Sequence, residues 1–101
     1  MNIIDLGGID RLVKRNSNLL TAFKVIDKIP AEIVVENIIR NVDEFACCKV
    51  IIHNNVLDIV SADGTVPISY YFADSYSYDD LKLILDEVKA HCQKSGIAFI
   101  E

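Results

Sequence analysis

Residues 45–61 read FACCKVIIHNNVLDIVS, and this stretch sets the kind of fold that the chain can form. Its first part, residues 45–53, is rich in the residue types that favour strands. Asn54 and Asn55 come next, and asparagine tolerates the positive φ angles that a tight hairpin turn requires. Residues 56–61 then read as the returning strand. The stretch therefore predicts an antiparallel hairpin.

A second turn follows the hairpin at Asp63 and Gly64, which form the strongest turn signal in the chain. Residues 65–73 then alternate between the two faces of a third strand. Pro67 has no N–H group to donate to a sheet ladder, so we expect this strand to begin at a sheet edge. The sequence thus predicts a three-stranded antiparallel meander. The side chains expected on one face of its third strand are Val66, Ile68, Tyr70 and Phe72.

Two helices are expected before the meander. In residues 9–27, apolar residues recur at steps of three and four, which is the period of an amphipathic helix. Residues 16–18 are Asn-Ser-Asn, whose side chains compete for backbone hydrogen bonds, so we expect a kink there or a break into two short helices. A second helix is expected over residues 30–43, because Pro30 suits the first helical position and Glu32 complements the helix dipole.

A third helix and a final strand are expected after the meander. Ser77 is a good N-cap, and Asp79 and Asp80 complement the helix dipole in the first turn. Gly96 ends the helix in the left-handed conformation that glycine adopts readily. Residues 97–100 then predict a short strand. Because it is entered from a helix, it runs parallel to the first and third strands of the meander, and it can pair beside either of them.

These elements give the order ααβββαβ, in which a C-terminal strand joins the antiparallel meander. We expect one α+β domain over residues 1–101, with the helices packed on one face of the sheet. The chain is 51% hydrophobic and has a mean hydropathy of +0.29, which is more apolar material than a small monomer easily buries. Either the core is unusually dense, or an apolar surface patch contacts a partner or a second copy in a homodimer.

The chain is acidic, with 15 acidic and 10 basic residues and an isoelectric point of about 4.9. A negative field repels phosphate backbones, which argues against direct nucleic-acid binding and suits a protein partner with a basic surface. No apolar run approaches the length of a membrane span, and the N-terminus lacks the features of a signal peptide. The three cysteines are an odd number, which fits a reducing compartment. We therefore expect a cytoplasmic protein that does not contact membranes.

The residues that could carry chemistry are poorly placed for it. Cys47 and Cys48 are adjacent in a predicted strand, so their side chains point to opposite faces, and their spacing does not fit a zinc site. Cys92 lies near a helix C-terminus, where the helix dipole disfavours a thiolate. A pairing of any of these thiols with His53 or His91 would therefore make a weak nucleophile. We expect no catalytic residue, no metal and no cofactor.

The segment over residues 69–80 is the most unusual part of the chain, because it holds all four tyrosines, interleaved with serine and aspartate. Tyrosine offers a large amphipathic contact area at low entropic cost, and this mixture is typical of binding surfaces. The alternative is that the tyrosines pack against the sheet and over its end. The predicted partner-binding residues are Tyr71, Asp74, Tyr76, Tyr78, Asp79 and Asp80.

Taken together, the sequence favours a small acidic protein-binding or regulatory domain that acts by contact and without catalysis. One special case is a stoichiometric inhibitor of the kind that phages and mobile elements encode, with an acidic surface that mimics nucleic acid. A small enzyme whose pocket is not visible in the sequence is a second alternative. A nucleic-acid binder is a third, through the basic helix face of Arg11, Lys14 and Arg15.

Overall fold

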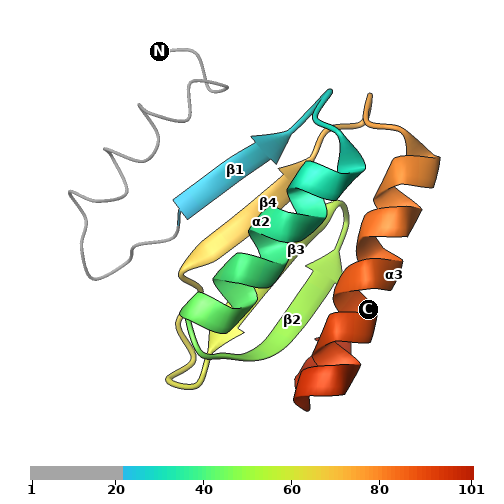
Figure 1. Ribbon diagram of the computed structural model, residues 1–101. Helices are drawn as coiled ribbons and strands as arrows, with labels where there is room; N and C mark the ends of the chain where they lie inside the picture. Colours follow the sequence, from blue (N-terminus) through green and yellow to red (C-terminus); the bar gives the residue numbers. More distant parts are fainter. Residues whose placement is uncertain (1–21) are drawn as a thin grey trace.

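The computed structural model describes residues 22–101, which form an α+β fold with the element order β-α-β-β-β-α-β (Figure 1). This part of the chain confirms the predicted fold class, with helices packed on a sheet. The basic helix face and the predicted kink at residues 16–18 lie outside the described residues. The elements are β1 (Ala22–Ile26), α2 (Ala31–Glu44), β2 (Cys47–His53), β3 (Val56–Ser61), β4 (Ile68–Phe72), α3 (Tyr78–Ser95) and β5 (Ala98–Ile100).

The sheet is five-stranded and mixed, with the strand order β1-β4-β3-β2-β5. The two predicted hairpins are present, because β3 pairs antiparallel with both β2 and β4. The sheet is nevertheless not a plain meander: β1 adds to β4 in parallel, and β5 adds to β2 in parallel. The C-terminal strand was predicted to pair beside either the first or the third strand of the meander. In the structure it pairs with the first, β2.

Residues 22–26 were expected to end a helix, and that prediction is wrong because they form β1. Phe23 and Ile26 fit a three-residue helical step, but a five-residue apolar run interrupted only by Lys24 is equally consistent with a strand. Pairing decides between the two periods. Ala22 to Ile26 align residue by residue with Ile68 to Phe72 of β4, so the open edge of β4 selects the strand.

The prediction that the third strand of the meander begins at a sheet edge is also wrong. β4 lies between β1 and β3. It begins at Ile68, so Pro67 stands just before the strand and its missing N–H group interrupts no ladder bond. The carbonyl of Pro67 accepts a hydrogen bond from the Ala22 amide at 2.9 Å, which starts the β1–β4 pairing.

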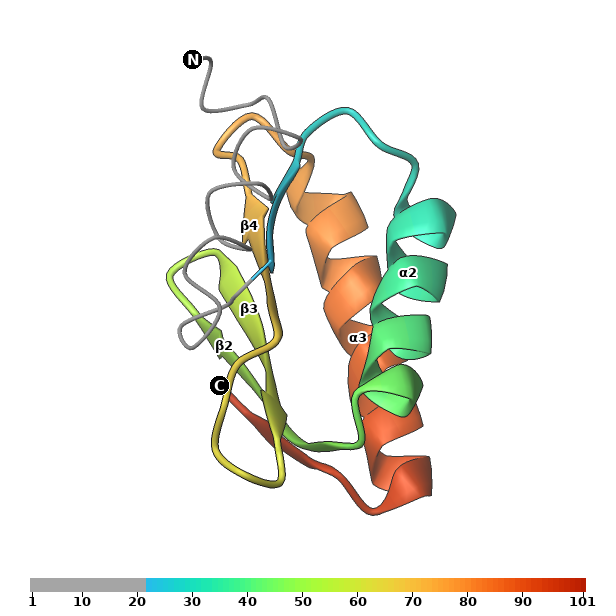
Figure 2. The ribbon, with the colours of Figure 1, turned by 90° about the vertical axis from the view of Figure 1, so that its left-hand side faces the viewer.

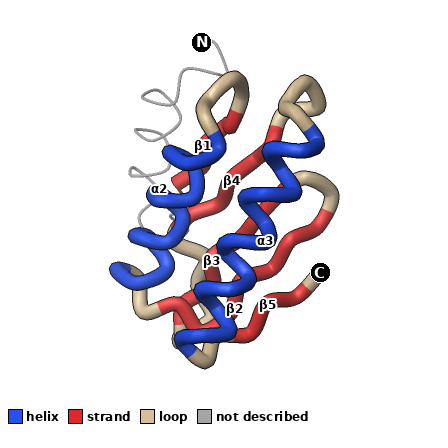
Figure 3. The backbone as a smooth tube through the Cα atoms, turned by 45° about the vertical axis from the view of Figure 1, so that its right-hand side comes forward, coloured by secondary structure: helices blue, strands red, loops and turns tan. Residues whose placement is uncertain are grey.

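Both helices cover the same face of the sheet (Figures 2 and 3). The connections β1–α2–β2 and β4–α3–β5 cross the sheet in the same direction, so crossovers of one hand place both helices on one side. The first turns of α2 and α3 consequently lie at the same end of the molecule, beyond the ends of β1 and β4 (Figure 1). Within residues 22–101, no helix is long and apolar enough to cross a membrane.

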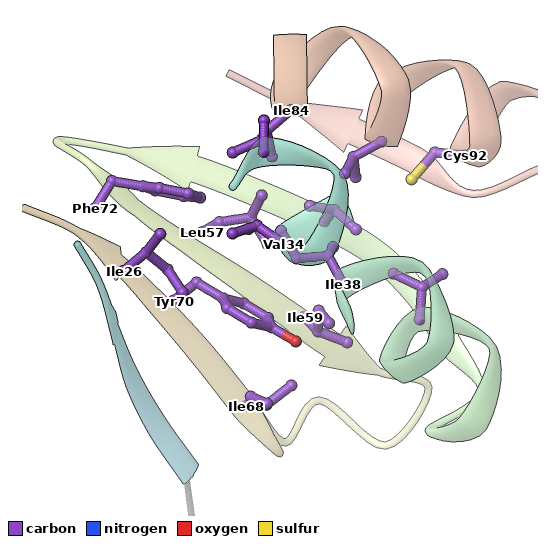
Figure 4. Packing of buried hydrophobic residues seen from close by; sticks show 14 of the residues in the cluster. Ile26, Val34, Ile38, Leu57, Ile59, Ile68, Tyr70, Phe72, Ile84 and Cys92 are labelled. Atoms are coloured by element: carbon purple, nitrogen blue, oxygen red, sulfur yellow. The ribbon is translucent and has the colours of Figure 1, made fainter. Parts of the chain in front are cut away.

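The core lies between the helices and the sheet. Figure 4 shows the side chains of Tyr70, Phe72 and Leu57 packed among those of Val34 and Ile84 from the two helices.

The two ends of α3 are as predicted. The Ser77 side chain accepts a hydrogen bond from the Asp80 amide at 3.4 Å, and Gly96 has a φ angle of 71°. The turn after β2 is also as predicted, with φ angles of 48° at Asn54 and 65° at Asn55.

Candidate functional site

The loops that follow β1 and β4 are bonded to each other at the end of the molecule where both helices begin. The Ala73 amide donates a hydrogen bond to the Ile26 carbonyl at 3.0 Å, which extends the β1–β4 ladder into the loops. The Ser75 hydroxyl donates to a carboxylate oxygen of Asp27 at 2.9 Å. The segment that the sequence marked as a contact surface is thus held against the loop between β1 and α2.

Tyr76 is the residue that joins the two loops, and it faces inward. Its side chain is 9% exposed, and its ring lies 6.0 Å from that of Phe72. Its hydroxyl donates to the Ile29 carbonyl at 2.7 Å. Burial raises the pKa of this phenol, and the negative charges of Asp80 and Glu32 add to the effect. For this tyrosine, the structure agrees with the packing interpretation rather than with a contact surface.

Tyr71 lies on a different surface from the loop residues. It points away from the helices, on the opposite face of β4 from Tyr70. Its ring stacks on that of Phe23 from β1, with 6.3 Å between the ring centroids. The six residues predicted to bind a partner therefore do not form one continuous surface.

The other four predicted residues do gather at the end where the helices begin. Tyr78 is the first residue of α3, and 75% of it is exposed. Asp79 and Asp80 follow it in the first turn, and Asp74 accepts a hydrogen bond from the Asn55 side chain at 3.2 Å. Asp27 and Glu32 come from the neighbouring loop and from the first turn of α2. We call this surface the acidic end; it comprises Asp27, Glu32, Asp74, Tyr78, Asp79 and Asp80.

A hollow of about 320 Å³ lies between the two loops, beside the acidic end. It has the size of a site for one large side chain or a small molecule. Its lining combines apolar surface, two serines, one ammonium group and one carboxylate. The lining residues are Lys28, Ile29, Pro30, Ser75, Tyr76, Ser77 and Asp80.

A second cavity, of about 230 Å³, lies between β1 and α2, and the sequence gave no sign of it. Its polar centre is the side-chain oxygen of Asn37. That oxygen accepts hydrogen bonds from the Tyr70 hydroxyl at 2.7 Å, from the Asn41 amide at 3.2 Å and from the Lys24 ammonium at 3.3 Å. Burial raises the pKa of Tyr70 to about 12, although the hydrogen bond from Asn41 opposes the rise. The apolar walls come from Val25, Ile26, Ile29, Ile33 and Val34.

Sequence reasoning missed this cluster for identifiable reasons. Lys24 was assigned to a helix rather than to a strand that faces α2. Asn37 and Asn41 are polar residues within the helix predicted over residues 30–43, and polar residues of such a helix are expected to face solvent, whereas Asn41 is buried and Asn37 is half-buried. Two asparagines four residues apart on one helix face were the available signal, because such a pair can share a buried partner.

The three cysteines are free thiols, and two of them are buried. Burial raises the pKa of Cys47, and it raises the pKa of Cys92 to about 11, so both are neutral near pH 7. Cys48 is exposed on β2, where its thiol donates to the Ser61 carbonyl at 3.4 Å. In the described part of the chain, no three histidine, cysteine or acidic side chains are grouped to hold a metal ion.

Within residues 22–101, neither His53 nor His91 forms a hydrogen bond with one of these thiols. His53 is exposed and lies 3.1 Å from the Asn54 side chain. His91 lies 2.9 Å from a carboxylate oxygen of Asp43, and this contact links α3 to α2. Both contacts are with polar side chains, and the one made by His91 joins the two helices.

Comparisons with protein-family models, with curated proteins and with solved structures find no match to this chain. The fold and the two candidate sites are therefore interpreted from the residues of this chain. The acidic end combines charge, an exposed aromatic ring and a hollow. The cavity between β1 and α2 combines apolar walls with one ammonium group.

Proposed function

We propose that this chain is a small acidic protein-binding domain that contacts a basic surface of another protein through its acidic end, without catalysis. The observation that supports this most directly is the exposure of Tyr78. An aromatic ring left three-quarters exposed at a helix start, among carboxylates, gains most when a partner covers it.

The charges at the acidic end favour a partner rich in arginine or lysine. Asp79 and Asp80 lie in the first turn of α3, and Glu32 lies in the first turn of α2, where the helix dipoles stabilise negative charge. Carboxylates held in this way can accept the paired N–H groups of a guanidinium. The face of the Tyr78 ring can attract the same cation through its π electrons.

The hollow beside the acidic end gives such a partner a place to anchor. Its lining includes the Asp80 carboxylate as well as the Lys28 ammonium, so a cationic side chain that entered it would meet a carboxylate on the Asp80 side. Interfaces draw much of their binding energy from a few side chains that fill pockets of this kind. The proposed contact therefore has a central anchor in the hollow and a rim formed by Tyr78 and the surrounding aspartates.

The stoichiometric-inhibitor hypothesis is a special form of the same proposal. In that form the partner is a nucleic-acid-binding protein, and the acidic end occupies its basic groove in place of phosphates. A competition experiment distinguishes the two forms. If a short DNA duplex displaces the captured partner, the inhibitor form holds; if it does not, the partner surface is basic for another reason.

The test uses the full chain as bait, because the partner has to be found before it can be measured. Affinity purification with mass spectrometry identifies the partner, and purified partner is then titrated against variants of the chain. Tyr78→Ala should weaken binding by roughly 30-fold, the factor that corresponds to a tyrosine hot spot of about 2 kcal/mol. Leu83→Ala is the matched control, because Leu83 lies on the same helix and is 44% exposed.

Two outcomes would contradict the proposal. One is equal binding by wild type and Tyr78→Ala. The other is an affinity that does not fall as salt concentration rises, since contacts between exposed opposite charges are screened by salt. Tyr76→Ala does not serve as a test, because that ring is buried and its removal would also destabilise the fold.

The cavity between β1 and α2 supports a second candidate function, the binding of a small apolar carboxylate. The Lys24 ammonium at the cavity provides a counter-charge, and the aliphatic walls fit a short hydrocarbon chain. This is also the pocket that a small enzyme would need. Hexanoate and hexanol are suitable probes. If the site is real, hexanoate binds, hexanol binds more weakly, and Lys24→Met removes the difference. Equal binding of the two probes would rule the site out.

A further inference from the structure

The Lys24 ammonium stands at the cavity between β1 and α2 without a counter-charge. Lys24 is half-buried, and within residues 22–101 it forms no ion pair. In that part of the chain its ammonium group contacts only the Asn37 side-chain oxygen, at 3.3 Å. A charge that is partly removed from water and left unpaired is unfavourable, and an anion beside it relieves that cost. The cavity therefore favours an anionic ligand.

The side-chain amide of Asn37 is held in one orientation by three donors. Its oxygen accepts from the Tyr70 hydroxyl at 2.7 Å, from the Asn41 amide at 3.2 Å and from Lys24. A flipped amide would set its own N–H groups against those of Asn41 and Lys24, so this orientation is the one that the contacts allow. The Asn37 nitrogen is consequently the free half of the amide, since it has no hydrogen-bond partner among the described residues.

We propose that this free amide nitrogen makes the cavity selective for a carboxylate, with Lys24 holding one carboxylate oxygen and the Asn37 amide holding the other. The inference rests on the second candidate function, the binding of a small apolar carboxylate, and names the residue that determines its selectivity. Both donors line the same cavity, and each has N–H groups to spare. A carboxylate offers an acceptor oxygen to each donor, whereas an alcohol has one oxygen to share between them.

The elements around the cavity give it a polar end and an apolar end. Lys24 lies beside Tyr70 in the sheet, and Asn37 bonds to both. Towards the loop that joins β1 to α2, Ile26 lies about 6.6 Å further along the strand, and Ile33 lies about 6 Å away along the helix. An extended hexanoate chain has about this length. The apolar end is open to solvent, because 55% of Ile33 is exposed.

Asn37→Asp tests the assignment with almost no change of shape. The oxygen that accepts from Tyr70, Asn41 and Lys24 is kept, while the free nitrogen is replaced by a second carboxylate oxygen. Hexanoate and hexanamide are titrated into the full chain by calorimetry. The wild type should bind hexanoate more tightly, because hexanamide has one acceptor oxygen and no charge. Asn37→Asp should weaken hexanoate binding by at least about tenfold, as expected for the loss of a hydrogen bond to a charged group.

The same variant should reverse the preference between the two probes, because the N–H groups of hexanamide then meet an acceptor in the cavity. Gln93→Glu is the matched control. It makes the same change from amide to acid at an exposed residue of α3 that does not line the cavity, so both affinities should stay as they are. Circular dichroism checks that each variant folds. In the unmodified chain, hexanoate should also shift the side-chain amide resonances of Asn37.

Four outcomes would overturn the proposal. If Asn37→Asp binds hexanoate as the wild type does, while Lys24→Met still removes the preference for hexanoate over hexanol, the carboxylate site stands and Asn37 has no part in it. An equal weakening by Gln93→Glu would assign the effect to overall charge. Asn37 side-chain resonances that stay in place at saturating hexanoate would refute the contact, whether or not the variant folds. A wild type that binds no hexanoate would refute the carboxylate site together with this assignment.

Discussion

Replacing Tyr70 with phenylalanine removes a single oxygen atom from the polar cluster that Tyr70 forms with Asn37 and Asn41. The Tyr70 hydroxyl donates to the Asn37 side-chain oxygen at 2.7 Å and accepts from the Asn41 amide at 2.5 Å. The ring itself is fully buried, and phenylalanine fills the same space. The change in stability therefore reports on hydrogen bonds rather than on packing.

The expected loss follows from the groups that remain. In Tyr70→Phe, the Asn37 oxygen still accepts from Lys24 and from Asn41, so it keeps partners. The Asn41 amide loses one acceptor inside the protein. A lost hydrogen bond costs about 1 kcal/mol, and the Asn41 N–H that pointed to the Tyr70 hydroxyl is left without a partner, which adds to the cost. We therefore expect a loss of about 1–2 kcal/mol in the free energy of unfolding.

Urea unfolding followed by circular dichroism measures this loss, and Tyr78→Phe is the matched control. Tyr78 carries the same hydroxyl on the surface, so its removal should change the free energy of unfolding by less than about 0.5 kcal/mol. The double variant Tyr70→Phe, Asn41→Leu should lose less than the sum of the two single variants, because the donor and the acceptor are then both absent. Equal stabilities for Tyr70→Phe and Tyr78→Phe would refute the described hydrogen-bond network.

Three further predictions concern Tyr76, the three cysteines and the ionisation of Tyr70. Tyr76→Phe removes the hydroxyl bond to a backbone carbonyl and should lower the free energy of unfolding by about 1 kcal/mol, measured by the same unfolding curves; no change would show that the loops are not joined in this way. In the folded chain, a thiol reagent such as DTNB should label Cys48 first, with Cys47 and Cys92 reacting only on unfolding; three equal rates would contradict their burial. The folded-state pKa of Tyr70 is raised to about 12, so its neutral form stabilises the fold fully below the unfolded pKa near 10, and this contribution is lost as pH rises from 10 through 12. Tyr70→Phe should lack this part of the alkaline loss of stability, and identical pH profiles would contradict it.

The sequence was sufficient to predict the elements whose local signals agree with their environment. The Asn54–Asn55 turn, the Ser77 cap and the Gly96 end of α3 depend on a few neighbouring residues, and all three were predicted. β1 was missed because a short, largely apolar run of five residues is consistent with either a helix or a strand. Only its pairing with β4, more than 40 residues later, decides between them.

For the candidate sites too, features that depend on neighbouring residues were predicted, and features that depend on contacts between distant residues were not. The unusual composition of residues 69–80 pointed to the loop before α3, which lies at the acidic end. Composition could not show that Tyr76 turns inward and Tyr78 outward, because the Ile29 carbonyl that holds the Tyr76 hydroxyl is remote in sequence. The Lys24–Asn37 contact was hidden for the same reason, since it joins two elements whose arrangement only the folded sheet defines.

The central claim is that the acidic end contacts a basic protein surface, and chemical-shift mapping tests it most directly. The full chain is titrated with an arginine-rich peptide while its backbone amide resonances are followed. The account predicts that shifts concentrate at Asp74, Tyr78, Asp79 and Asp80, that Tyr78→Ala reduces them, and that Leu83→Ala does not. Shifts spread evenly over the acidic residues of the whole chain, or centred on Glu101 beside Lys89, would contradict it.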